Sequence, residues 1–348
     1  MSVRSINKRV RIKDVAEQAG VSTATVSHVI NQTRFVTEPT RQRVLRAIEN
    51  CNYYPNAHAR SLASGRSHTI GLLVSDISNP FFPELVKSIE VAASDRGYDI
   101  ILASSNYDAR RTSDYVRRMI GRQVAGVLLM TSEVDQDLIE ELIDSEVPVV
   151  FYNLEPTATR INNVIVDCEV GIEEALSHLV SLGHRQIAHL AGPQATRAGS
   201  QRLAAFQHCV AKYLPGSQAL ICEGDFRVEG GRRAASELLA RAALPTAVIA
   251  ANDMMALGLM KEFRSAGLAI PRDISVIGFD DIAFAALSDP PLSTVSLPRI
   301  ELGRRVVEAL MMTIDPPGAG GFEFHVSTHL LVRGSTAPCR PQAAKQIQ

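Results

Sequence analysis

Near its N-terminus the chain reads Ile12-Lys13-Asp14-Val15-Ala16-Glu17-Gln18-Ala19-Gly20-Val21-Ser22-Thr23-Ala24-Thr25-Val26-Ser27-His28-Val29-Ile30-Asn31, the most specific local pattern of the sequence. Val15, Ala16 and Ala19 give the first half one apolar face, as in a short amphipathic helix. Gly20 is suited to end that helix because glycine adopts positive φ without steric cost. Ser22 can cap a second helix, and two short helices joined by a glycine-containing turn form the helix-turn-helix pattern.

The distribution of charge supports a nucleic-acid partner for this region. Residues 1 to 66 hold 11 Lys/Arg and 4 Asp/Glu, a balance of +7. The totals of 36 and 37 leave 25 basic and 33 acidic residues downstream, a balance of −8. A basic head on an acidic body is typical of a DNA-binding module joined to a sensor. The competing interpretations are an ordinary helical core and a solvated basic face.

The literal motif decides between these interpretations. Lys-Asp-Val-Ala at 13–16, followed by Ala-Gly-Val-Ser-x-x-Thr-Val-Ser-x-Val-Ile-Asn at 19–31, closely resembles the headpiece of the lactose-repressor (LacI/GalR) family of bacterial regulators, especially its purine-repressor branch. The resemblance implies a three-helix headpiece, a hinge helix and a periplasmic-binding-protein-like core of two discontinuous, doubly wound α/β subdomains. It also implies a homodimeric transcriptional repressor, which binds a palindromic DNA operator and responds to a small-molecule effector.

The same resemblance assigns DNA-contacting residues. Thr23, Ala24 and His28 match the base-facing positions of the second helix. Phosphate contacts, which position a protein without specifying sequence, are expected from Ser22, Thr25, Asn31 and Arg34. Farther along, Ala-x-Ala-Arg-Ser-Leu matches the hinge helix, so Leu62 is expected to wedge into the minor groove beside Arg60.

Two helix starts carry individual expectations. Arg11 stands where the family usually has a Thr cap, and losing that acceptor should cost about 1 kcal/mol. Asp14 offsets part of this cost in the first turn, so we expect a slightly frayed start. Thr37 can cap a third helix, with Pro39 in its first turn, where a missing N–H does no harm.

From residue 69 apolar strand-length runs alternate with helical spacing, which predicts two parallel sheets covered by helices on both faces. The first series has strands at 70–74, 99–103, 126–130 and 147–152, with helices at 80–96, 108–122 and 135–145. The second has strands at 186–191, 218–222, 247–251 and 274–279, with helices near 171–182, 199–213, 229–241 and 253–266. A last helix at 300–314 and one strand-like segment at 323–332 complete the pattern. The expected domains are a headpiece at 1–56, a hinge at 57–67, a core at 68–337 and a flexible tail at 338–348.

Open α/β sheets bind ligands at the carboxyl ends of their strands, where polar and aromatic residues gather here. Carried over from the family, Phe81 and Phe82 flank the effector and Arg202 clamps it, while Asn252 and Asp280 are polar contacts and Phe226 is an aromatic wall. Alternatively, Asp253 caps the helix that follows and Phe82 is plain core. Thr196, Ala198 and Asn153 depart from the purine branch, and Asn153 in place of a flat wall favours a sugar or sugar-like polyol.

Other classes of protein are disfavoured. There is no Gly-x-Gly-x-x-Gly after the first strand and no Walker, Gly-x-Ser-x-Gly or His-Glu-x-x-His motif, so we expect neither an enzyme nor a cofactor. His178, His184 and His189 lack metal spacing and are expected on a surface or helix end. Five scattered cysteines and the lack of an apolar leader favour a cytoplasmic protein with no membrane association over a periplasmic sugar- or nucleoside-binding protein on the same body.

Overall fold

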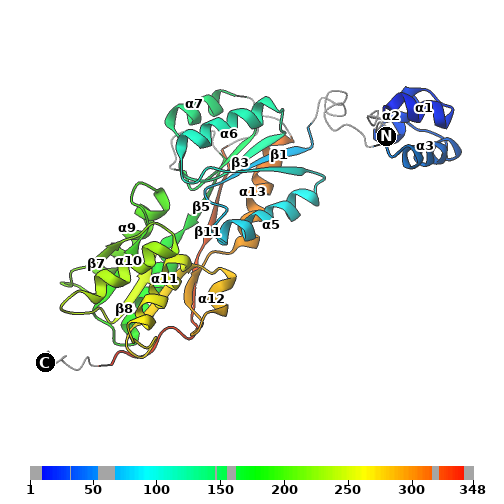
Figure 1. Ribbon diagram of the computed structural model, residues 1–348. Coiled ribbons are helices and arrows are strands. Elements are labelled where there is room, and N and C mark those ends of the chain that lie inside the picture. The colour runs from blue at the N-terminus through cyan, green and yellow to red at the C-terminus, as the bar shows by residue number, and fades with distance from the viewer. Residues whose placement is uncertain are drawn as a thin grey trace, which may run out of the picture. The chain divides into compact units, whose positions relative to one another are not determined.

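A computed structural model describes residues 10–31, 33–53, 67–145, 147–154, 162–315 and 321–340. The chain divides into two compact units, Met1–His68 and Thr69–Gln348, which are considered separately (Figure 1). Arg60 and Leu62, and with them residues 57–66 of the predicted hinge, lie outside the described residues.

The first unit contains three helices, α1 (Ile12–Ala19), α2 (Thr23–Asn31) and α3 (Glu38–Cys51). Gly20 has the predicted positive φ of 63° and ends α1. The Ser22 hydroxyl accepts a hydrogen bond from the backbone N–H of Thr25 at 3.1 Å, which confirms it as the cap of α2. The buried side chains of the three helices form one small core: Val15, Ala16, Ala19, Val26, Val29, Val44 and Ala47.

At the two helix starts, the fraying expected at Arg11 stays a prediction, and the side-chain cap expected from Thr37 is wrong. The first helix begins directly after Arg11, because Asp14 Oδ2 accepts the backbone N–H of Arg11 at 2.7 Å. This bond supplies one half of a capping box and replaces the missing Thr. Thr37 does occupy the N-cap position of α3, but its hydroxyl bonds the hydroxyl of Thr40 and caps no backbone N–H.

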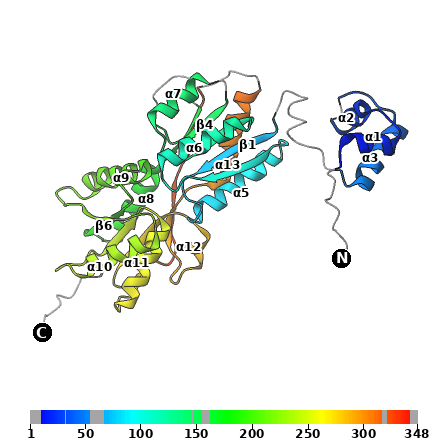
Figure 2. The same ribbon diagram turned by 45° about the horizontal axis from the view of Figure 1, so that its top comes forward.

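The second unit consists of two α/β subdomains, each built on a six-stranded sheet (Figures 1 and 2). The first sheet has the order β11-β5-β4-β3-β1-β2 and the second the order β12-β10-β9-β8-β6-β7. The first subdomain comprises β1 (Thr69–Val74), α5 (Phe81–Ser94), β2 (Asp99–Ser104), α6 (Ala109–Gly121), β3 (Gly126–Met130), α7 (Gln136–Asp144), β4 (Val149–Tyr152), β5 (Asn162–Asp167), α13 (Arg299–Ile314) and β11 (Glu323–Ser327). The second comprises α8 (Cys168–Ser181), β6 (Ile187–Ala191), α9 (Arg197–Tyr213), β7 (Leu220–Glu223), α10 (Val228–Leu239), β8 (Ala247–Ala250), α11 (Asp253–Ser265), β9 (Ser275–Asp280), α12 (Ala283–Leu287), β10 (Ser293–Ser296) and β12 (His329–Leu331).

The chain passes between the subdomains after β5, after β10 and at Thr328. The single strand expected at 323–332 is therefore wrong, because β11 pairs in parallel with β5 whereas β12 pairs antiparallel with β10 in the other sheet. Thr328 is buried at this break, where its hydroxyl donates to the carbonyl of Asp167 at 2.8 Å and accepts the N–H of Gly171 at 3.1 Å. The discontinuous subdomains implied by the family resemblance are confirmed.

The expectation of histidines on a surface or a helix end fails at His189, whereas His184 lies at the end of α8, where its backbone N–H bonds the carbonyl of Leu179 at 3.0 Å. His184 is buried, and His189 lies fully buried inside β6. The His189 ring stacks on Phe206 with centroids 4.8 Å apart, and its Nδ1 lies 2.9 Å from the carbonyl oxygen of Ile249. Burial lowers the pKa of His189 to about 4, because the charged imidazolium would be cut off from water.

His189 should therefore make the protein sensitive to acid. The folded state holds His189 neutral down to about pH 4, whereas the unfolded chain binds the proton near pH 6.5, so stability falls as pH drops through this window. Relative to His189→Gln, the parent should lose roughly 3 kcal/mol between these limits. Chemical denaturation from pH 7 to 4 measures this difference, with the exposed His208→Gln as the control. Parallel pH profiles for the parent and His189→Gln would contradict it.

Candidate functional site

The first unit presents a small polar face at the start of α2. Ser22, Thr23 and Ala24 are exposed, and Thr25 and His28 are half-buried. The face is ordered internally, because the Ser22 and Thr25 hydroxyls lie 2.9 Å apart and His28 Nδ1 lies 2.8 Å from the hydroxyl of Thr33. This arrangement leaves short side chains and one imidazole edge available to base edges in a groove.

Asn31 and Arg34, at the end of α2 and just beyond it, differ from each other. Asn31 is half-buried, its Nδ2 donates to the Ser27 hydroxyl at 3.1 Å, and its buried Oδ1 has no partner among the described residues. Arg34 is exposed and can reach a phosphate. Among the four residues predicted to contact phosphates, Arg34 is therefore the one with a positive charge. The amide of Asn31 already bonds Ser27 within α2.

In the second unit Arg202 is the central buried charge. Its guanidinium donates to the carbonyl of Ala251 and lies 3.3 Å from Asp280 Oδ1. The same group lies 3.7 Å from the ring centroid of Phe279 and 5.9 Å from that of Phe226, so two aromatic faces flank it. Three elements, α9, β8 and β9, position these groups at the carboxyl ends of parallel strands.

Asp280 ends β9 in an unusual backbone conformation, with φ at 110°, and Asp281 follows at 57°. Burial raises the pKa of Asp280 to about 6, while Arg202 and Arg299 act in the opposite direction. The other titratable groups that interact with it electrostatically are Asp253, Tyr107 and Tyr152. The Asp280 carboxyl should therefore lose its proton near pH 6.

Phe226 forms an aromatic wall next to Arg202. Its ring stacks on Tyr107 of the first subdomain, with centroids 5.9 Å apart and an interplanar angle of 29°. Gly192 faces this ring, and any Cβ there would collide with it. The Asn252 side chain fixes the wall, because Nδ2 donates to the Phe226 carbonyl at 2.9 Å while Oδ1 caps α11 by accepting the N–H of Met255 at 2.9 Å.

Asp253 does not cap α11, contrary to the alternative considered above. Its carboxylate is buried and accepts hydrogen bonds from the Thr294 hydroxyl at 2.6 Å and from the backbone N–H of Ile282 at 2.9 Å. Burial raises its pKa well above the usual value, and the neighbouring Asp280 acts in the same direction. Asp253 thereby fixes the loop that follows β9.

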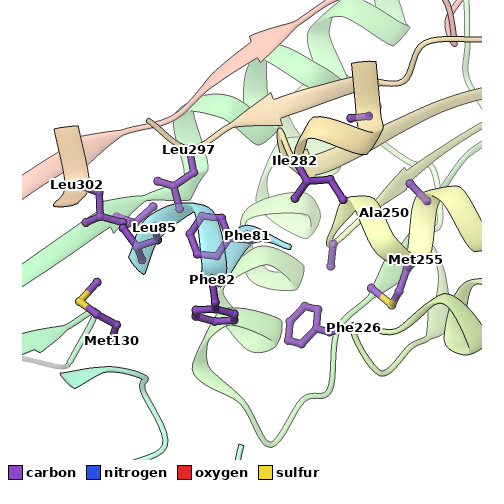
Figure 3. Packing of buried hydrophobic residues seen from close by; sticks show 14 of the residues in the cluster. Phe81, Phe82, Leu85, Met130, Phe226, Ala250, Met255, Ile282, Leu297 and Leu302 are labelled. Carbon is purple, nitrogen blue, oxygen red and sulfur yellow. The ribbon is translucent and has the colours of Figure 1, made fainter. Parts of the chain in front are cut away.

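The first subdomain contributes aromatic and amide side chains. Phe81 and Phe82 at the start of α5 are both buried and pack edge to face with centroids 5.2 Å apart, and in the view of Figure 3 they lie between Leu85 and Phe226. Asn153 Oδ1 accepts the N–H of Val166 at 3.2 Å, and its Nδ2 donates to Gln201 in α9 at 2.6 Å. Asn153 is thus a contact between the two subdomains.

The seven residues predicted to bind an effector therefore gather around one polar and aromatic cluster: Phe81, Phe82, Asn153, Arg202, Phe226, Asn252 and Asp280. The sequence prediction missed Phe279, Gln201 and Arg299 as members. Phe279 lies within an apolar strand and Gln201 within a polar helix, so neither carried a distinguishing signal. Burial raises the pKa of Tyr107, another member, and the carboxylates of Asp280, Asp76 and Glu133 add to this effect.

A helix-turn-helix unit joined to two α/β subdomains, with a buried polar cluster at their strand ends, defines a DNA-binding regulator with a ligand-sensing body. Residues 11–56 match the family described as bacterial regulatory proteins, lacI family, and residues 176–336 match the periplasmic binding protein-like domain. The chain belongs to the LacI family and is a transcriptional repressor of that family, as its headpiece motif predicts.

Known proteins resemble almost the whole chain. The HTH-type transcriptional repressor PurR of Photobacterium profundum is 37% identical over 326 residues, which cover 93% of this chain and 98% of the relative. The lac repressor dimer bound to operator and the anti-inducer ONPF has a TM-score of 0.84 at 31% identity, covering 95% of this chain and 100% of that one. A complex of the transcriptional regulator CelR with cellobiose has a TM-score of 0.69 at 33% identity, covering 94% and 100%. Since these relatives are transcription regulators, they support the non-enzymatic interpretation.

Two further findings concern the described ranges only. None of their helices is long and apolar enough to cross a membrane. They also contain no group of three or more His, Cys, Asp or Glu side chains placed to hold a metal ion.

The Asp280 carboxyl should leave a signature in the pH dependence of stability. Its pKa is 3.8 when unperturbed and about 6 when folded, so the folded state retains the proton longer. The stability that this provides is present below pH 3.8 and is lost as pH rises through 6. Relative to Asp280→Asn, the parent should lose roughly 3 kcal/mol between pH 4 and 7. Denaturant titrations measure this loss, and the exposed Asp289→Asn serves as the control; a constant difference across this range would count against the assignment.

Proposed function

We propose that this repressor binds a palindromic operator as a homodimer, with α2 of each headpiece in a major groove. Thr23, Ala24 and His28 would face base edges, with Ala24 offering apolar contact to a thymine methyl. The exposed or half-buried polar face at the start of α2 supports this role. The lac repressor structure in complex with operator is a dimer, which supports the same assembly here. Ser22, Thr25, Asn31 and Arg34 would contact phosphates, and Arg60 and Leu62 the minor groove.

Arg34→Gln should weaken operator binding without changing which sequence is preferred, since a phosphate contact carries no sequence information. The slope of log K against log salt should become shallower by about 0.9 for the one lost contact. The operator is first selected from a randomised pool of palindromes with the parent, and affinity is then measured from low to high salt. Arg46→Gln, an exposed arginine of α3, is the matched control. Equal slopes for all three proteins would show that Arg34 makes no such contact.

Leu62→Ala tests the predicted hinge wedge. An apolar wedge kinks DNA at a cost of a few kcal/mol that the wider contact repays, so its removal should weaken operator affinity strongly. Thermal unfolding of residues 69–340 should not change, because the substitution lies before β1. Unaltered affinity in a gel-shift titration would remove this role from Leu62.

For the effector we propose a small polyhydroxylated molecule, a sugar or sugar derivative, bound between the subdomains. The observation that carries this is the buried Arg202–Asp280 pair next to the Phe226–Tyr107 stack, which offers a donor fork, a carboxylate and aromatic faces at one place. The CelR structure contains cellobiose, and a LacI-family regulator from Enterococcus faecium contains ribose, at 32% identity and a TM-score of 0.71 over 78% of this chain and 100% of that one.

A purine is the second candidate, because the similar repressors from Photobacterium and Vibrio are named PurR. Two positions argue against it. The Thr196 hydroxyl accepts the N–H of Gly199 at 3.1 Å and donates to the Pro193 carbonyl at 2.7 Å, so it has no proton left to donate to a base. Asn153 is engaged with Val166 and Gln201 and provides no flat wall for a base.

A thermal-shift screen of the full chain separates the two candidates. D-ribose, cellobiose, hypoxanthine and guanine are added singly, and a ligand at a hundred times its Kd should stabilise the protein by about 2.7 kcal/mol. We expect stabilisation by a sugar and its loss in Arg202→Gln, with Arg304→Gln, an exposed arginine of α13, as the control. Stabilisation by purines alone would replace the sugar with the second candidate.

A further inference from the structure

We propose that Arg299 is a positioning residue that holds the backbone of Asp280 in place and ties the Arg202–Asp280 pair to helix α5 of the first subdomain. The inference rests on the proposed effector role of that pair. It adds a route by which the state of the effector site reaches the other subdomain. Nothing in the headpiece motif or in the effector positions carried over from the family points to Arg299.

Arg299 lies where the chain returns from β10 of the second sheet to α13, which packs on α5. Its side chain is 19% exposed, and its guanidinium has partners on both sides of this crossing. Nε lies 3.0 Å from Glu84 Oε2 in the first turn of α5, and Nη1 donates to the carbonyl of Asp280 at 2.5 Å. Nη2 lies 4.0 Å from Asp281 Oδ2. One side chain thus joins α5 to the end of β9.

Glu84 strengthens this connection because its two oxygens have different partners. Oε2 pairs with Arg299, and Oε1 accepts the backbone N–H of Ala283 at the start of α12, at 3.2 Å. Ala283 belongs to the second subdomain and Glu84 to the first. The carboxylate also lies in the first turn of its own helix, where the helix dipole favours negative charge.

The backbone at Asp280 requires such a support. A φ of 110° is sparsely populated for any residue with a Cβ, and such conformations persist only where the surroundings impose them. The next residue is held through its side chain, since Asp281 Oδ1 accepts Arg333 at 2.6 Å and Oδ2 accepts the Ser296 hydroxyl at 3.1 Å. Arg299 bonds the Asp280 carbonyl itself, and it alone among these supports also pairs with a side chain of α5.

These contacts form a continuous series from Arg202 through Asp280 and Arg299 to Glu84. Phe81 and Phe82, which belong to the proposed effector site, lie in the same first turn of α5 as Glu84. A ligand that changes the Arg202–Asp280 geometry would therefore act on the start of α5 through charged hydrogen bonds. Coupling between two sites requires an element whose conformation both sites influence. Here that element is the backbone at Asp280, which the effector site influences through Arg202 and the start of α5 influences through Glu84 and Arg299.

Hydrogen–deuterium exchange of the full chain, without DNA or sugar, tests the inference. In Arg299→Gln, exchange in peptides covering residues 281–285 and 82–88 should rise about tenfold, because Glu84, which accepts the Ala283 amide and lies in the first turn of α5, loses the guanidinium that fixes its side chain. Peptides of α10 should be unchanged. Arg304→Gln is the matched control, because Arg304 lies on the same helix, is 53% exposed and pairs with Glu308 of that helix. Arg299→Lys should restore part of the protection.

A double substitution distinguishes a connecting role from a purely structural one. Asp280→Asn should raise exchange at 82–88 in the parent and should add nothing in the Arg299→Gln background. In that background, the stability difference that Asp280→Asn produces should level off at a pH above 6, because Arg299 lowers the pKa of Asp280 in the parent. If Arg299→Gln does not fold, Glu84→Gln carries the same exchange test.

Two results would overturn the inference: unchanged exchange at 281–285 in both Arg299→Gln and Glu84→Gln, or an Asp280→Asn effect on 82–88 that persists without Arg299. Because neither DNA nor sugar is present, a negative sugar screen would leave this test intact. Conversely, if an effector binds the protein but the exchange experiment shows no coupling through Arg299, only the role inferred for Arg299 is wrong and the proposed function stands.

Discussion

Burial of the Arg202 guanidinium is the constraint on which the inter-subdomain site depends. A charge removed from water is costly unless it is paired and hydrogen-bonded, and removal of one partner of a buried pair is strongly destabilising. The chain therefore brings the carbonyl of Ala251, the carboxylate of Asp280 and the ring of Phe279 to one point. These groups come from the ends of β8 and β9, so the geometry of the parallel sheet is what satisfies the charge.

Around this charge, most polar side chains serve two purposes at once. Asn252 caps α11 and also fixes the Phe226 wall, and Asn153 accepts a backbone N–H and also bonds Gln201 across the subdomains. Asp253 does not cap α11. Its carboxylate instead holds the loop after β9 by accepting hydrogen bonds from the Ile282 N–H and the Thr294 hydroxyl. A site whose polar groups are already satisfied is preorganised, and a ligand that replaces one of these bonds must change the others.

The sequence predicted the helix-turn-helix and the parallel strands because each has a local signal, whereas the effector-site residues came from the family resemblance and remain predictions. Apolar runs such as Gly126–Met130 are typical of strands buried on both faces, and the motif at 19–31 is literal. The prediction failed for strands whose sequences are polar and for strands whose pairing depends on residues far away in the chain. Strand β10 reads Ser-Thr-Val-Ser, and β11 and β12 are one continuous pattern that is divided between two sheets at Thr328. His189 is a polar residue in an apolar environment, which only the packing against Phe206 reveals.

The sequence gives no sign of the role proposed for Arg299, because that role depends on two other segments of the chain, the first turn of α5 at Glu84 and residues 280–283 after β9. Glu84, Asp280 and Ala283 meet at the crossing between β10 and α13, where the first and second subdomains share one short stretch of backbone. Motions of one subdomain against the other must concentrate at such crossings, since the sheets themselves are rigid. A guanidinium with partners in both subdomains resists that motion only while both partners stay in place. If the proposed effector binds at Asp280, the same contacts that stabilise one arrangement of the subdomains would transmit a shift of that backbone to α5 through Arg299 and Glu84.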